Sequence, residues 1–178
     1  RLTANFHMLF NIVMAVPFLF LLGPFAALLE RWLPEVKETN DVSVPRYLDE
    51  SVTESPAMAL ICATRETMRM ADLVDSMLQS AIKAIMTNDR KLVAEVRQRD
   101  NAVDRLHEAI KLYVVKITHG SLDEAEGRRA MEILSLAINL EHIGDIIDKN
   151  LMELASKKIK RQLQFSSEGA AELEEFHR

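Results

Sequence analysis

Two pairs of carboxylates in this 178-residue sequence have a spacing that would let them bind a cation. The first acid pair is Asp100 with Asp104, and the second acid pair is Glu141 with Asp145. In a helix, residues four apart lie on the same side, roughly 6 Å from each other. Like charges at this spacing repel, so each pair needs either solvent or a nearby cation to offset the repulsion.

The two acid pairs are expected to face each other. Each pair lies at the flank of the apolar stripe of its own helix, and Gly120 marks the turn between the two helices. The pairs lie at similar distances before and after that turn, so an antiparallel hairpin brings them to the same height. Counted through the preceding turn, Asp72 approaches the same level.

Carboxylates from facing helices are a known way to build a multi-metal site in a helical bundle. Oxygen ligands alone suit hard cations such as Mg²⁺, Mn²⁺, Ca²⁺ or ferric iron. The predicted ligands are Asp100, Asp104, Glu141 and Asp145, with Asp72 as a further candidate. The alternative is a solvated acidic rim balanced by Arg105, Lys111 or Lys149.

The remaining polar residues indicate no enzyme. Glu66 lies nearer Lys111 than the acid pairs, which predicts a surface ion pair. His107 and His142 are interpreted as histidines at the rim of the bundle, and Cys62 as a small buried hydrophobe. The sequence contains no nucleophile–base arrangement and no glycine-rich phosphate loop. Its net charge of −5 argues against a nucleic-acid surface.

The elements that position the acid pairs are long helices. Three runs without a helix breaker cover residues 56–87, 90–118 and 122–158, and short turns join them, so they are predicted to form an antiparallel three-helix bundle. We expect residues 159–178 to begin a further helix or a tail. The third run predicts one shared apolar face, made of Ile133, Leu136, Leu140, Ile143, Ile147, Leu151 and Leu154.

The first part of the sequence is different, because Leu2–Leu29 contains no Asp, Glu, Lys or Arg. The run Leu9–Leu29 is long enough to cross a bilayer, which needs about 20 apolar residues. The sequence therefore predicts an all-α chain with one transmembrane helix ahead of the bundle. Residues 1–33 are assigned to the end of a membrane domain and residues 34–55 to a connector, with further membrane helices expected upstream.

Residues 56–157 resemble the PhoU-like domain. The resemblance is carried by Asp100–Asp104 and by Glu141–Asp145, which match the (Asp/Glu)-x-x-x-Asp motifs of that family, with His142 where Arg is common. It implies a multinuclear metal cluster of iron, manganese or zinc on the bundle surface. PhoU proteins contain two such helical units, so the bundle is expected to be truncated at its C-terminus.

The stretch Ala4–Asn11 resembles the A-N-x-H-x-x-F-N segment of the bacterial sodium/phosphate cotransporter family, and Pro45–Asp49 is similar to the connector of those proteins. This resemblance implies sodium-dependent transport of inorganic phosphate in the plasma (inner) membrane, with the bundle on the cytoplasmic side. His7 and Asn11 share a helix face and are candidates for contact with substrate or with other membrane helices.

Two further hypotheses remain open from the sequence. One is a membrane-tethered phosphate-signalling adaptor without transport activity, and the other is a helical dimerisation module whose acids are solvated. A homo-oligomer is compatible with each of these hypotheses.

Overall fold

The computed structural model describes residues 6–8, 10–11, 13–14 and 41–177. The chain divides into two compact units, residues 1–41 and residues 42–178. In the first unit the described residues between 6 and 14 are helical and exposed, His7 and Asn11 among them. Most of the predicted transmembrane helix, Leu9–Leu29, lies outside the described residues. Within the described part of the chain, no helix has the length and apolar character needed to cross a bilayer.

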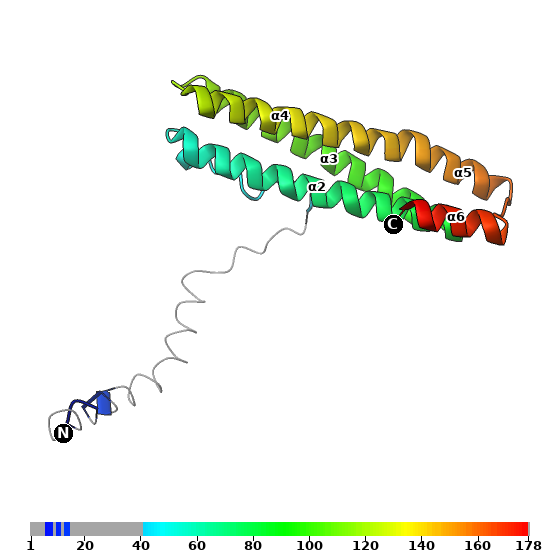
Figure 1. Ribbon diagram of the computed structural model, residues 1–178, viewed down its shortest axis with the longest axis horizontal. Coiled ribbons are helices and arrows are strands. Elements are labelled where there is room, and N and C mark those ends of the chain that lie inside the picture. The colour runs from blue at the N-terminus through cyan, green and yellow to red at the C-terminus, as the bar shows by residue number, and fades with distance from the viewer. Residues whose placement is uncertain (1–5, 9, 12, 15–40, 178) are drawn as a thin grey trace. The chain divides into compact units, whose positions relative to one another are not determined.

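The second unit is built from helices, and the described residues contain no strand. Its elements are η1 (Glu50–Val52), α2 (Pro56–Thr87), α3 (Arg90–Thr118), α4 (Glu124–Asp145), the π-helical turn η2 (Ile146–Leu151), α5 (Met152–Lys160) and α6 (Ser167–His177). Figure 1 shows α2, α3 and the continuous rod of α4, η2 and α5 side by side, with α6 at the end that carries α5. The predicted all-α bundle is confirmed, and so are the predicted bounds of its first two helices.

Local sequence explains where these helices begin and end. Asn88 adopts a left-handed conformation (φ 58°) that closes α2, and the Asp89 carboxylate accepts hydrogen bonds from the first amides of α3. Asp123 and Glu126 form a reciprocal capping box. This cap starts the third long helix at Glu124, two residues later than predicted from the apolar pattern.

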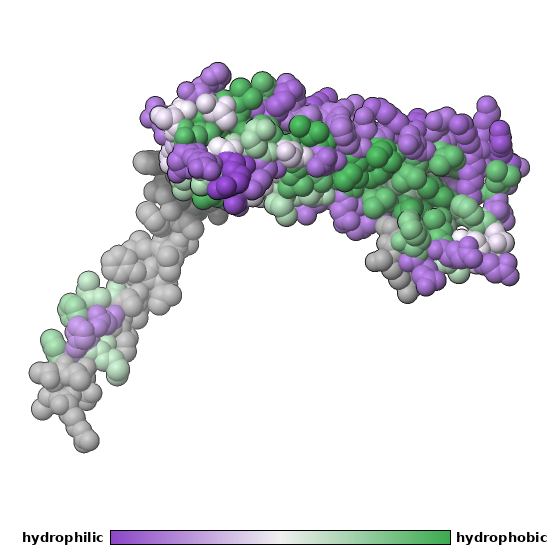
Figure 2. All heavy atoms as spheres, turned by 45° about the horizontal axis from the view of Figure 1, so that its top comes forward, coloured by the Kyte–Doolittle hydropathy of each residue, from purple (hydrophilic) through white to green (hydrophobic). Residues whose placement is uncertain are grey.

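The third helix buries only part of the predicted face, since Ile133, Leu140 and Ile147 lie in the core. Its buried side is narrow and built largely from small residues, including Ala130, Ala137 and Gly144. Small side chains allow close packing against α2 and α3, and this leaves bulkier neighbours at the flanks. Leu136, Ile143 and Leu154 are 43%, 44% and 59% exposed, so the prediction that they belong to the core was wrong. Figure 2 shows apolar side chains on the surface, densest toward the end with α5 and α6.

A second difference concerns the path of the third helix. The π-helical turn η2 contains one more residue per hydrogen-bonded loop than an α-helix and therefore rotates the residues that follow it. No helix breaker marks this turn, because Ile146–Leu151 contains neither Gly nor Pro. A straight-helix projection cannot place α5 correctly for this reason.

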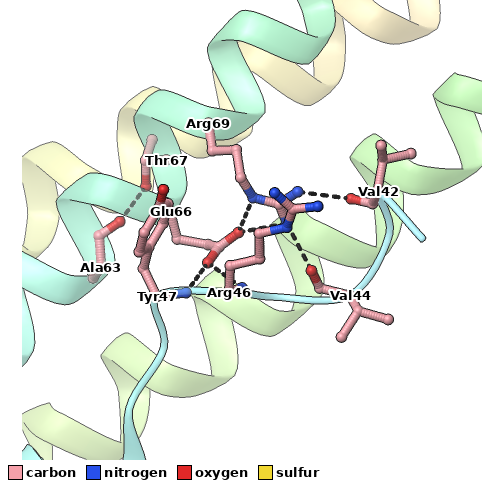
Figure 3. A network of polar contacts seen from close by, with 8 residues as sticks. All are labelled: Val42, Val44, Arg46, Tyr47, Ala63, Glu66, Thr67 and Arg69. Atoms are coloured by element: carbon pink, nitrogen blue, oxygen red, sulfur yellow. Dashed lines mark hydrogen bonds and ion pairs between the residues drawn. The ribbon is translucent and has the colours of Figure 1, made fainter. Parts of the chain in front are cut away.

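The segment that precedes α2 is fastened to the bundle by a buried carboxylate. Glu66 is fully buried on α2, and its Oε2 accepts hydrogen bonds from the backbone amides of Arg46 (2.8 Å) and Tyr47 (2.7 Å). Its Oε1 pairs with the guanidinium of Arg69 at 2.7 Å. Figure 3 shows this arrangement, which we call the Glu66 network. The predicted surface ion pair of Glu66 with Lys111 was wrong, because Lys111 pairs with Glu108 instead.

Arg69 completes the network by donating to the carbonyl oxygens of Val42 (3.0 Å) and Val44 (2.8 Å), as Figure 3 also shows. Farther along the connector, the Tyr113 hydroxyl on α3 donates to the Asp49 carbonyl oxygen at 2.6 Å. The connector from residue 42 to residue 55 is therefore held against α2 and α3 by directed hydrogen bonds.

Candidate metal centre

Three of the predicted carboxylates converge where α3 meets the end of α4. Asp100 and Asp104 lie one turn apart on α3, and Asp145 is the last residue of α4. One carboxylate oxygen of each lies within 4.8 Å of the others. We call these three residues the acid patch. The antiparallel packing of α3 and α4 produces this convergence, as the positions about the Gly120 turn predict.

Asp100 is the buried member of the acid patch. The residue is 8% exposed, and its Oδ1 is a buried atom with no hydrogen-bond partner among the described residues. Gly144 on α4 makes room for it, since a Cβ at that position would lie 3.1 Å from the Asp100 Oδ1. An unpaired buried carboxylate oxygen is costly, and a proton or a cation at this position would offset that cost.

Electrostatics at the acid patch disfavour ionised Asp100. Burial is the largest cause that raises the pKa of the Asp100 carboxyl to about 6, and the neighbouring carboxylates Asp104, Asp148 and Asp145 contribute to the same rise. Lys149 acts in the opposite direction, but its ammonium is engaged by the Asp145 Oδ2 at 2.5 Å. The acid patch therefore carries more negative charge than its basic neighbour neutralises.

The other basic residues that could balance a solvated rim lie elsewhere. Arg105 donates to the Ser43 hydroxyl at 3.0 Å, and Lys111 pairs with Glu108. Of the three basic residues considered from the sequence, Lys149 alone pairs with the acid patch among the described contacts. This partial balance favours a bound cation over a fully compensated rim.

The structure does not bring all predicted ligands together. Glu141 lies beside His142, with 3.6 Å between the Glu141 Oε2 and the His142 Nε2, and is outside the group of three converging carboxylates. Asp72 is exposed on α2 and is also outside this group, while His107 is half-buried on α3.

Sequence reasoning missed Asp148. Its Oδ1 is buried without a hydrogen-bond partner in the described part of the chain, and the Arg97 Nε lies 3.5 Å from it. Asp148 follows Asp145 by three residues within η2, so its charge reaches Asp100. A search for carboxylates three as well as four residues apart would have found it.

The donor set fits a hard cation. It offers carboxylate oxygens from three residues, and one of those oxygens is buried without a partner. Such oxygens are the preferred ligands of Mg²⁺, Mn²⁺, Ca²⁺ and ferric iron. When bound, the cation would be held by Asp100, Asp104 and Asp145 and would offset their mutual repulsion.

Comparisons with known proteins agree with the helical bundle. Residues 67–154 match the PhoU domain, and this range contains the whole acid patch. No solved structure matches this chain.

The chain is also similar to proteins that carry the name "Putative inorganic phosphate export protein YjbB". It is 30% identical over 174 residues to the protein of Escherichia coli (strain K12) and 33% identical over 178 residues to that of Salmonella typhimurium (strain LT2). Each comparison covers 98% of this chain and 32% of the relative. The chain therefore spans about a third of the length of the curated relatives that it matches.

Proposed function

We propose that this chain is part of a sodium-dependent membrane transporter of inorganic phosphate, and that its PhoU-like bundle is a cytoplasmic regulatory domain that binds a cation at the acid patch. The observation that carries the cation site is the buried, unpaired Oδ1 of Asp100 facing two further carboxylates. The match to the PhoU domain and the similarity to proteins named for phosphate export support the transport context.

Regulation follows from the position of the acid patch between two helices. Bound cation joins carboxylates from α3 and α4 that otherwise repel each other, so it favours the closely packed arrangement of these helices. The same α2 and α3 hold the connector through the Glu66 network and Tyr113. A change in the packing of α2 and α3 can therefore reach the connector through these hydrogen bonds.

The cation site is tested by metal analysis of the 178-residue chain purified without chelator. We expect a stoichiometric hard cation, such as iron or manganese, in the wild type, and loss of that metal in an Asp100→Asn, Asp145→Asn variant. Asp75→Asn is the matched control, because Asp75 is an exposed carboxylate on α2 that contacts Gln79. Glu141→Gln should retain metal, since Glu141 is outside the converging group. Equal metal content in all four proteins would contradict the proposed cation site.

The transport context needs a separate measurement in the full-length protein. We expect phosphate flux across inverted membrane vesicles to require sodium and to change when Asp100 and Asp145 are neutralised. Flux that persists when choline replaces sodium would contradict sodium coupling. If the protein moved no phosphate under any condition but its acid-patch variants altered phosphate-responsive gene expression, the adaptor hypothesis would replace transport.

A further inference from the structure

A pocket of about 630 Å³ lies between α3 and α5. Its basic residues are Arg90 and Arg97 from α3 and Lys160 from α5. Ser156 adds a hydroxyl, and Val93 and Ile159 supply an apolar floor. No Asp or Glu is among the lining residues, although the net charge of the chain is −5.

The basic residues of this pocket are available to a ligand. The side chains of Arg90 and Lys160 make no hydrogen bond or ion pair within the part of the chain that the structure describes, unlike those of Lys149, Lys157 and Lys158. Arg97 is engaged only through its Nε, which faces Asp148 at 3.5 Å, so its terminal nitrogens remain able to donate. Three cations around one hollow, with two of them lacking a partner, repel each other unless an anion joins them.

We propose that this pocket binds the phosphate group of a small phosphate-bearing molecule, with Arg90, Arg97 and Lys160 contacting the oxyanion and Val93 and Ile159 contacting the body that carries it. Guanidinium groups match phosphate oxygens in geometry, and charge-assisted hydrogen bonds are the strong ones. The apolar floor and the size of the pocket, which falls in the usual range of roughly 300–1,000 Å³ for organic ligands, select a phosphate ester over the bare ion.

The pocket and the acid patch share a structural link. Arg97 belongs to both surroundings, because it lines the pocket and its Nε lies 3.5 Å from the Oδ1 of Asp148, whose charge acts on Asp100. An oxyanion that draws Arg97 into the pocket leaves Asp148 with less compensation. The phosphate site is nevertheless a separate site, and it stands without a cation at the acid patch.

The test measures binding by the intact 178-residue chain at fixed ionic strength. The probes are adenosine 5′-monophosphate, inorganic phosphate, uncharged adenosine, and vesicles containing phosphatidylglycerol. The pocket variant carries Arg90→Gln and Lys160→Gln, neither of which contacts the acid patch. The matched control carries Arg128→Gln and Arg129→Gln, which remove the same charge from exposed positions on α4.

We expect adenosine 5′-monophosphate to bind saturably and more tightly than inorganic phosphate, adenosine not to bind, and the pocket variant to lose about tenfold or more in affinity. The control should bind as the wild type does. If vesicle binding is lost in the pocket variant but not in the control, the phosphate group that the pocket binds is that of a lipid headgroup. Absence of binding to every probe, or equal loss in the pocket and control variants, would overturn the proposal.

Discussion

Glu66 and Asp100 are two buried carboxylates in one bundle, and their surroundings are opposite. Glu66 is fully buried, yet both of its oxygens are paired with an arginine or with backbone amides. Asp100 is 8% exposed, yet one of its oxygens has no described partner and its closest charged neighbours include three carboxylates. Burial alone therefore does not distinguish a structural carboxylate from one in a binding site.

The chain itself supplies a positive charge to Glu66, but it places none in contact with Asp100. Arg69 lies three residues after Glu66 on the same helix and provides its positive charge within the fold. At the acid patch, Lys149 serves Asp145 and leaves Asp100 without a cation in contact. Glu66 thus holds the connector against α2, whereas Asp100 is the carboxylate to which the proposed cation would bind.

The largest effect is expected when the charge of Glu66 is removed without a change of shape. Glu66→Gln replaces an acceptor oxygen by an amide donor that faces N–H groups, and it leaves the buried side of Arg69 unpaired. We expect the free energy of unfolding to fall by about 3 kcal/mol. Chemical denaturation measures this change, and Glu108→Gln is the control, because the exposed Glu108–Lys111 pair contributes little. A fall no larger than that of the control would show that the Glu66 network is dispensable.

The corresponding acid-to-amide substitution at Asp100 should stabilise the protein instead of destabilising it. Asp100→Asn removes a charge that burial and three neighbouring carboxylates disfavour. In metal-free protein near pH 8, we expect the free energy of unfolding to rise by about 2 kcal/mol. Denaturation in the presence of chelator measures it. A loss of stability comparable with that of Glu66→Gln would mean that ionised Asp100 stabilises the fold as Glu66 does, which would contradict the proposed difference between the two carboxylates.

The helices could be predicted from the sequence because apolar periodicity, Ser55–Pro56 and Asp89 mark them locally. The convergence of Asp100 and Asp145 was also predictable, since their distances from the Gly120 turn are similar. The role of Glu66 was not, because its partners are backbone amides 19 and 20 residues away that carry no side-chain signal. Asp148 was not predicted because it follows Asp145 by three residues, whereas the predicted pairs are four residues apart.

A pH titration should separate the two carboxylates further. Folded protein retains the Asp100 proton up to a pKa of about 6, whereas the usual value is 3.8. The folded state thus binds more protons between these values, so this group adds stability as the pH falls from 7 toward 4. We expect a gain of about 1 kcal/mol between pH 7 and pH 5 in metal-free wild type, relative to Asp100→Asn. Parallel pH profiles for the two proteins would contradict the raised pKa.

The smallest effect probes the space that Gly144 leaves for Asp100. An added methyl group at Gly144 would lie 3.1 Å from the Asp100 Oδ1 and 3.4 Å from the Val103 Cγ1, and both atoms are held by packing. Gly127, on the same helix, has nothing within 4 Å of the corresponding position. We expect Gly127→Ala to stabilise the protein by up to about 1 kcal/mol through helix propensity, and Gly144→Ala to lose that gain or become destabilising. Thermal unfolding of the two variants measures the difference, and Gly144→Ala should also weaken metal binding by displacing Asp100. Equal stabilisation by both substitutions would show that the Asp100 carboxylate moves freely, and that its position beside Gly144 is not fixed by the fold.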